Sequence, residues 1–385
     1  MALFINTERN RLQRYDKVLI YTRKNEKKCK ILFISHFFRT FALEMNHSLI
    51  HNRLSLWYQQ HARVLPWRET SNPYHIWVSE VILQQTRVNQ GIHYYLRLLY
   101  RFPTVQSLAE ATEDEVLLYW QGLGYYSRAR NMHKAAQLIA QRLEQSSLSL
   151  EQIDDVFSFW RSLPGIGEYT AGAIASFAYN LPYIAMDGNV YRVLSRLYDC
   201  DIPFDSTAGK KHFRQLGQEL LDTEHPRDYN SAIMEFGALH CTPTSPDCTH
   251  CPIQECCLAY AHGTVDLLPV RQPRAALRER FFNYTIYCTD DMRTLISQRR
   301  QKDIWQHLYE FPLQESDTLL PTPPDAPCVE LTHVLSHQRL HARFHIKKVS
   351  ELPQIPDTIA IALKDIDDYA LSRLTLKALS SFFKP

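Results

Sequence analysis

Long apolar segments are absent from this 385-residue chain, and neither sign of charge predominates. No apolar run approaches the roughly 18 residues that a membrane-spanning helix needs. The nearest, ILFISHFF from Ile31, contains His36 and is soon followed by Arg39, so no membrane span is predicted. The 43 Lys and Arg side chains nearly balance the 41 Asp and Glu side chains. Total charge therefore gives no support for a nucleic-acid partner, which has to be argued from local features.

The beginning of the chain differs from the rest in charge and in pattern. Up to Glu44 it carries ten Lys and Arg against four Asp and Glu, shows no helical or strand periodicity, and ends just before Met45. A DNA-binding arm and a targeting peptide are two interpretations, although interleaved acids and a late apolar stretch fit a targeting peptide poorly. We favour a third, in which Met45 is the true first residue. Residues 1–45 are therefore expected to be a basic N-terminal extension that need not be native.

Helical periodicity begins just after the extension. From Ser48 to about Ala261, apolar residues recur three and four apart, as in SLIHNRLSLWYQQ, which predicts amphipathic helices joined by short turns. Asn72-Pro73 is a typical helix start, with asparagine as the N-cap and proline in the first turn. We expect a mainly α domain over residues 46–262.

After Gly263 the pattern changes to one of short strands. Two prolines and scattered charge predict a linker over residues 263–277. FFNYTIYCT and LHARFHIKKV read as strands, the second by its alternation of polar and apolar residues, and LSRLTLKALSSFF predicts a closing helix. A smaller α+β domain is therefore expected over residues 278–385.

Four of the nine cysteines share one compact pattern: Cys241, Cys248, Cys251 and Cys257, separated by six, two and five residues. Four thiolates this close in sequence can surround one metal centre. A zinc site usually shows two CxxC pairs and only one is present, so zinc is the less favoured alternative. The spacing resembles the [4Fe–4S] loop of the endonuclease III-like DNA glycosylases, where a cysteine on every iron suits a structural cluster. Cys256 could replace Cys257, but the five-residue gap favours Cys257.

The stretch LPGIGEYTAGA, over residues 163–173, uses several of the chain's only eleven glycines. Gly165 and Gly167 would allow a tight turn with positive φ angles between two apolar helical stretches. Backbone N–H groups at the start of the following helix can then bind an anion. This is the helix-hairpin-helix pattern, which holds a DNA phosphate without reading sequence. A plain turn between helices is the alternative.

Three motifs occur in the order and spacing of the endonuclease III superfamily. Asp187, ahead of the helical segment GNVYRVLSRL, lies twenty residues beyond Gly167, and the four-cysteine loop follows it. The resemblance covers about Leu54 to Leu258. It implies a helix-hairpin-helix DNA glycosylase domain that carries the hairpin and an iron–sulfur loop over residues 241–257.

Two further stretches narrow the resemblance. Superfamily members that also nick DNA carry a lysine before the hairpin threonine, and that lysine forms a Schiff base with the sugar. Here the position holds Tyr169, whose phenol cannot form an imine, so a monofunctional glycosylase without efficient AP-lyase activity is expected. LPWRETSNPYHIWVSEVILQQTRV and GLGYYSRARN resemble the adenine DNA glycosylases of the MutY kind. This resemblance implies removal of adenine mispaired with 8-oxoguanine, or less readily with guanine, in base excision repair.

The same resemblance implies the catalytic residues. Glu80 matches the catalytic acid, and burial on its apolar helix would raise its pKa so that it can protonate N7 of adenine. Asp187, near a helix N-terminus, would stay ionised and stabilise the cationic sugar. Tyr169 is expected to touch the reacting nucleotide, Asn189 to orient the site, and Arg68 to reach toward the acid.

Flipping the adenine out of the duplex leaves a gap in the base stack. Gln85 and Tyr125 match the family positions that wedge into this gap and contact the partner base. Packing on a helix surface is the alternative for both residues.

In this family the second domain resembles a Nudix hydrolase but recognises 8-oxoguanine. QHLYEFPL, from Gln306, resembles one of its segments, whereas the Nudix catalytic box needs glycines and the chain has none after Gly263. Nucleotide hydrolysis by this domain is therefore excluded. Ser336 and His337 match the lesion-reading segment, while Leu335 stands where phenylalanine is usual.

The same part of the chain contains four histidines spaced four apart: His333, His337, His341 and His345. The spacing suggests a metal site, but the alternation from His341 to Lys347 favours a strand with one basic face suited to phosphate.

We therefore expect a monomeric bacterial protein, cytoplasmic and nucleoid-associated, with a [4Fe–4S] cluster and with duplex DNA holding adenine opposite 8-oxoguanine or guanine as its partner. One alternative is an endonuclease III-like glycosylase for oxidised pyrimidines, which Tyr169 and the second domain disfavour. The other is a non-catalytic iron–sulfur protein that scans DNA, which the presence of Glu80 and Asp187 disfavours.

Overall fold

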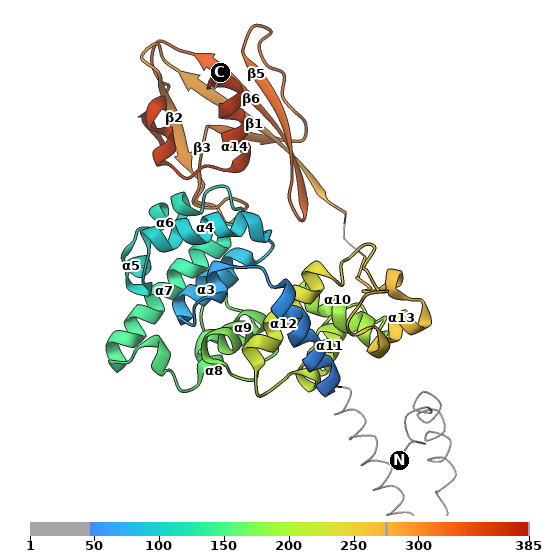
Figure 1. Ribbon diagram of the computed structural model, residues 1–385. Helices are drawn as coiled ribbons and strands as arrows, with labels where there is room; N and C mark the ends of the chain where they lie inside the picture. The colour runs from blue at the N-terminus through green and yellow to red at the C-terminus, as the bar shows by residue number, and fades with distance from the viewer. Residues whose placement is uncertain (1–46, 274–275, 384–385) are drawn as a thin grey trace, which may run out of the picture. The chain divides into compact units, whose positions relative to one another are not determined.

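The computed structural model describes residues 47–273 and 276–383 (Figure 1). The basic extension predicted over residues 1–45 lies outside the described residues. The described residues form two compact units. The described residues of the smaller unit are 47–63 and 186–271, and those of the larger unit are 64–185, 272–273 and 276–383.

The smaller unit is helical. After a helix over residues 47–61 it contains α10 (Gly188–Leu197), α11 (Thr207–Leu220), α12 (Pro226–Leu239), η3 (Gln254–Cys256), α13 (Leu258–His262) and η4 (Val265–Leu267). Arg63 joins the end of the first helix to α12: its Nε and Nη2 each donate at 2.7 Å to the carboxylate of Glu235, which is 1% exposed. A bidentate pair of this kind fixes both the distance and the relative orientation of the two side chains.

The larger unit begins with helices packed around three fully buried tryptophans, Trp77, Trp120 and Trp160. Its helices are η1 (Pro66–Arg68), α3 (Pro73–Leu83), α4 (Val88–Arg101), α5 (Val105–Glu110), α6 (Glu113–Trp120), α7 (Ser127–Ser146), η2 (Leu150–Gln152), α8 (Val156–Arg161) and α9 (Glu168–Tyr179).

Helix α3 is buried on nearly every side, from Pro73 to Ile82. The side chain of Asn72 accepts hydrogen bonds from the backbone N–H groups of Tyr74 and His75, and Pro73 occupies the first helical position. The predicted helix start is therefore confirmed. A helix that is apolar around its whole circumference must lie inside a protein, which makes α3 the centre of this helical part.

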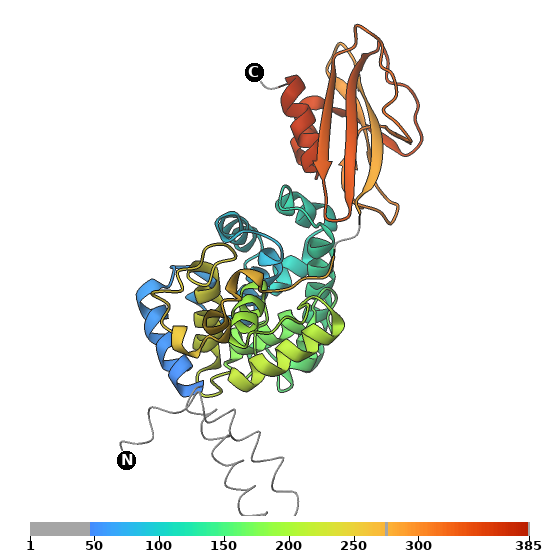
Figure 2. The ribbon, with the colours of Figure 1, turned by 90° about the vertical axis from the view of Figure 1, so that its right-hand side faces the viewer.

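The rest of the larger unit is an α+β region. It contains β1 (Arg278–Cys288), β2 (Arg293–Gln298), β3 (Tyr309–Glu310), β4 (Leu313–Ser316), β5 (Cys328–Val334), β6 (Gln338–Lys348), β7 (Thr358–Ala362), η5 (Leu363–Asp368) and α14 (Arg373–Phe383). One sheet has the order β4-β1-β6-β5, with β1 and β6 parallel, and the other has the order β3-β2-β7. Figure 2 shows α14 along one face of the strands, where Leu374 and Ala378 join the core around Tyr284 and Phe344.

The predicted change from helices to an α+β region is confirmed, as are both predicted strands and the closing helix. Helix α13 ends at His262, and β1 begins at Arg278. The domain limits themselves stay predictions, and the segment from Val265 to Arg271 groups with the smaller unit. No helix in the described ranges is long and apolar enough to cross a membrane.

Candidate functional site

Glu80 lies on α3 with only 5% of its surface exposed. Its helix neighbours Trp77 and Val81 are buried as well. The predicted apolar helix is confirmed, and the carboxyl is buried on it. The protonation and the catalytic role of Glu80 stay predictions.

Asp187, in the smaller unit, was predicted near a helix N-terminus, and it is the N-cap of α10. Its Oδ1 accepts a hydrogen bond from Val190 N at 2.8 Å, and its Oδ2 accepts one from Asn189 Nδ2 at 2.7 Å. Burial raises the pKa of Asp187 above its usual value, while these hydrogen bonds and the nearby charge of Arg192 oppose the rise. Four interactions therefore favour the charged carboxylate against burial: the backbone N–H groups of Val190 and Asn189, the Asn189 side chain and the charge of Arg192. The charge of Asp187 during catalysis stays a prediction.

Arg192 continues the chain of contacts from Asn189 toward the cysteine loop. Its Nη2 donates to Asn189 Oδ1 at 2.9 Å and to Gly237 O at 2.6 Å, and its Nε donates to Cys241 O at 2.8 Å. Asn189 also needs a glycine opposite it, because a Cβ at Gly237 would lie 2.7 Å from its own Cβ. The prediction did not include Arg192, although its place three residues after Asn189 puts both on one helix face.

The predicted hairpin lies between α8 and α9, but its two glycines act differently. Gly165 has φ +76°, and an added Cβ would approach Asn131 Cβ to 2.7 Å, so this position requires glycine. Gly167 has φ −84° and an extended backbone, so the expectation of a positive φ there is wrong. A Cβ at Gly167 would meet nothing within 4 Å.

Helix α9 begins after Gly167, which is its N-cap and makes no side-chain cap hydrogen bond. Backbone N–H groups at the start of a helix can bind an anion. Phosphate binding at this turn stays a prediction.

Tyr169 lies half-buried in the first turn of α9. Its neighbour Thr170 accepts a hydrogen bond from Gln84 Nε2 at 3.2 Å, which ties the end of α3 to the start of α9. Arg68, the last residue of η1, is also half-buried. The predicted roles of Tyr169 beside the nucleotide and of Arg68 near the acid stay predictions.

Gln85 and Tyr125, the predicted wedge residues, have left-handed backbones, with φ +59° and +47°. Both side chains are exposed, and Tyr125 exposes 45% of its surface. Neither residue lies within a helix, and the wedge role of both side chains stays a prediction. Left-handed backbone is costly for residues other than glycine, so neighbouring groups must hold it.

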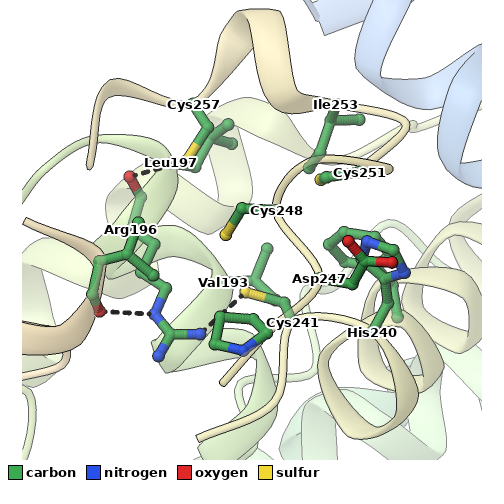
Figure 3. Close-up of a pocket in the computed structure, with 13 residues that line it drawn as sticks. Val193, Arg196, Leu197, His240, Cys241, Asp247, Cys248, Cys251, Ile253 and Cys257 are labelled. Atoms are coloured by element: carbon green, nitrogen blue, oxygen red, sulfur yellow. Dashed lines mark hydrogen bonds between the residues drawn. The ribbon is translucent and has the colours of Figure 1, made fainter. Parts of the chain in front are cut away.

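The four predicted ligands Cys241, Cys248, Cys251 and Cys257 line one cavity (Figure 3). Cys256 is not among the lining residues. In the ranges 47–273 and 276–383, no three His, Cys, Asp or Glu side chains are grouped as ligands of a single ion. A four-iron cluster makes a different demand, because each cysteine binds its own iron around a larger centre. The four cysteines among the lining residues match that demand in number and kind, and the cluster itself stays a prediction.

Arg196 fastens the cysteine loop to α10. This side chain is 2% exposed, and its Nη1 lies 3.3 Å from Cys241 Sγ and 2.7 Å from Thr242 O. Burial raises the pKa of the Cys251 thiol to about 12. A thiol of that kind becomes a thiolate only when a metal or a cation stabilises it.

The segment predicted to read the lesion, residues 335–337, connects β5 to β6. Ser336 and His337 are exposed, with Ser336 Oγ 3.1 Å from His337 Nδ1. Leu335 instead packs against the core of the α+β region. The first two side chains are therefore accessible, while the leucine is partly occupied by packing; contact with a damaged base stays a prediction.

The predicted strand with a basic face is β6. Its alternating burial confirms the strand, but two of the basic side chains already have acidic partners: His341 pairs with Glu279 and Arg343 with Glu330. The positive charge available to a phosphate is therefore smaller than the sequence indicates.

Two family models match the chain. The model of HhH-GPD superfamily base excision DNA repair proteins matches residues 78–220, and a NUDIX domain model matches residues 283–381. A solved structure of a thermostable thymine-DNA glycosylase is similar in fold, with a TM-score of 0.52, 21% identity, and coverage of 57% of this chain and 99% of that chain.

Two curated relatives carry the name adenine DNA glycosylase. The protein from Buchnera aphidicola subsp. Baizongia pistaciae is 32% identical over 270 residues, which cover 68% of this chain and 74% of that protein. The Mus musculus protein is 42% identical over 235 residues, which cover 57% of this chain. The chain spans only 44% of the length of the mouse relative.

Proposed function

Since the chain belongs to the family of adenine DNA glycosylases, we propose that it hydrolyses the N-glycosidic bond of adenine in duplex DNA. The preferred substrate is adenine paired with 8-oxoguanine, with guanine as a lesser partner. The observation that carries the proposal is Glu80, a carboxyl that is 5% exposed on an apolar helix.

In the proposed reaction Glu80 donates its proton to N7 of the adenine. The bond between C1′ and N9 then breaks, and its electron pair leaves with the neutral base. A buried carboxyl group is suited to this step because burial disfavours its charged form.

Asp187 has the complementary task of stabilising the positive charge that develops on the sugar. The N-terminus of α10 and the donors Val190 and Asn189 hold its carboxylate in one orientation. Water then adds to C1′ and releases a proton, which leaves an abasic site. Because Tyr169 cannot form an imine, the strand stays intact.

The DNA is held by groups that do not take part in the chemistry. Backbone N–H groups after Gly167 would bind a phosphate, and Gln85 and Tyr125 would fill the gap left by the flipped base. Ser336 and His337 would contact the 8-oxoguanine. We further propose that the protein acts as a monomer, nucleoid-associated in a bacterial cytoplasm; bacterial relatives such as the Buchnera protein support a bacterial source.

The four cysteines of the cavity would hold a [4Fe–4S] cluster. When bound, the cluster supplies four iron–sulfur bonds that cross-link the loop over residues 241–257. Such cross-links would keep the Cys241 carbonyl in place as the acceptor of Arg192.

The test is single-turnover base release from a duplex with one adenine opposite 8-oxoguanine, beside an A·T control. Release confined to the mispair, with strand breaks only after alkali, is the expected result. If the protein released oxidised pyrimidines instead, it would be an endonuclease III-like enzyme. If it bound DNA without releasing any base, it would be a scanning protein, and either result would overturn the proposal.

A further inference from the structure

Arg128, in the first turn of α7, makes an unusual set of contacts with the last turn of α3. Its Nη1 donates to three carbonyl oxygens, those of Val81 and Ile82 at 2.8 Å and that of Gln84 at 2.6 Å. The last carbonyls of a helix have no partners within it, and they carry partial negative charge. One guanidinium therefore satisfies the open end of the helix that carries Glu80.

The same guanidinium also holds the loop that precedes α7. Its Nη2 donates to Gly124 O at 3.2 Å, and the backbone N–H of Arg128 donates to Tyr125 O at 2.9 Å. The guanidinium carbon lies 5.6 Å from the ring centre of Tyr125 and 5.1 Å from that of Trp120. Contacts at these distances are cation–π interactions.

Arg128 thus lies between the two residues with strained backbones, Gln85 (φ +59°) and Tyr125 (φ +47°). Gln85 directly follows the carbonyl of Gln84, and Tyr125 directly follows that of Gly124, and both carbonyls accept from Arg128. A left-handed residue other than glycine persists only where its surroundings hold it. One cation therefore holds the backbone directly before each of the two exposed side chains.

The cation is not held there by an acid. No carboxylate forms an ion pair with Arg128 in the part of the chain that the structure describes, and its Nε is buried without a hydrogen-bond partner. Burial lowers the pKa of Arg128 to about 10, so the side chain is still charged at neutral pH. A buried cation supported by carbonyls and rings is costly, which indicates a purpose other than stability.

We propose that Arg128 is a positioning residue that presets Gln85 and Tyr125 for reading the base opposite the adenine. The proposal rests on the proposed function, because it takes these two side chains to be the DNA wedge. In this proposal Arg128 does not contact the DNA. It affects the discrimination of the partner base only through the positions of Gln85 and Tyr125.

The test measures the binding of R128M to two duplexes. In both, the adenosine carries a 2′-fluorine, which slows cleavage by destabilising the cationic sugar; one has 8-oxoguanine opposite and the other an abasic analogue. We expect R128M to weaken binding of the first duplex about tenfold or more, since hydrogen bonds from a charged group are lost. Binding of the second duplex should change little, because it holds no base to read.

R128K and R142M complete the experiment. Lysine keeps the charge but loses the planar fork that reaches carbonyls on two elements, so R128K should retain the fold and show the same selective loss. Arg142, also on α7, contacts Ser162 Oγ and the Phe159 ring, and R142M should bind both duplexes as the wild type does.

Equal weakening on both duplexes by R128M and R128K would show a merely structural role and overturn the proposal. Unchanged binding of the 8-oxoguanine duplex by both variants would overturn it as well. Adenine release by the wild-type protein tests the proposed function on its own. A failure of that function is therefore distinguished from a failure of the proposal for Arg128.

Discussion

Asn189 donates a hydrogen bond from its Nδ2 to Oδ2 of Asp187 at 2.7 Å, and its own Oδ1 accepts from Arg192. Arg192 therefore orients the Asn189 amide, and the amide in turn orients the Asp187 carboxylate. Since Arg192 also donates to the carbonyl of Cys241, the predicted catalytic carboxylate and the first cysteine of the loop are joined through two side chains.

Replacing Asn189 by alanine removes a donor that favours the charged form of Asp187. The pKa of Asp187, already raised by burial, should rise further, because a donor to the carboxylate is lost. Since the proposed reaction uses the carboxylate, the rate should fall off at a higher pH as the solution is acidified. The measurement is the pH profile of single-turnover adenine release. The control Q215A removes an exposed amide–carboxylate hydrogen bond on α11, and an unshifted acidic limb in N189A would contradict the argument.

The variant D187N should separate activity from stability. A carboxyl whose pKa is higher in the folded than in the unfolded chain weakens folding at pH values above both, where it must be charged. Asparagine keeps the N-cap acceptor for Val190 N but cannot also accept from Asn189 Nδ2. The lost hydrogen bond and the removed buried charge oppose each other, so the melting temperature at neutral pH should change little. Adenine release should fall by at least about a hundredfold.

The matched control for D187N is D155N, which alters the N-cap of α8. It should leave adenine release unchanged. A near-normal rate in D187N would refute the charge role of Asp187, and a collapse in its melting temperature would refute the stability argument.

Glu80→Gln removes the proposed proton donor while keeping its size. Adenine release should fall by at least about a hundredfold, the usual minimum for a general acid. Binding to the mispaired duplex, measured by gel shift, should persist because the wedge and hairpin are untouched. The control E144Q changes an exposed residue of α7, and retained turnover in E80Q would remove Glu80 from the mechanism.

The adjacent thiols of Cys256 and Cys257 provide an internal test of the cluster. Cys257 lines the cavity and Cys256 does not. C257S should lose the broad visible absorption of a [4Fe–4S] protein and its bound iron, and its melting temperature should fall. C256S should keep all three properties. The opposite pattern would exchange the two assignments, and a colourless zinc-containing wild type would reject the cluster.

Local sequence patterns were sufficient to predict many elements of this protein. The Asn72 cap, the strands of the α+β region and the helix start at Asp187 follow from residue types within a few positions of one another, because caps and alternation are local effects. The family was also predicted correctly, since motifs of fixed spacing survive at 32% identity. The same locality explains why Gly167 was misjudged: glycine permits a positive φ but does not require it.

Arg128 and Arg192 could be identified only in the folded chain. The acceptors of Arg128 on α3 lie 44 to 47 positions away in sequence, and Gly237 and Cys241 lie 45 and 49 positions from Arg192. An arginine carries no mark of which carbonyls it will meet, because tertiary packing chooses them. The sequence by itself determined which side chains are available for chemistry and which local elements carry them. Tertiary structure alone decided how buried guanidinium groups hold those side chains, since hydrogen bonds between distant segments exist only after the core has formed.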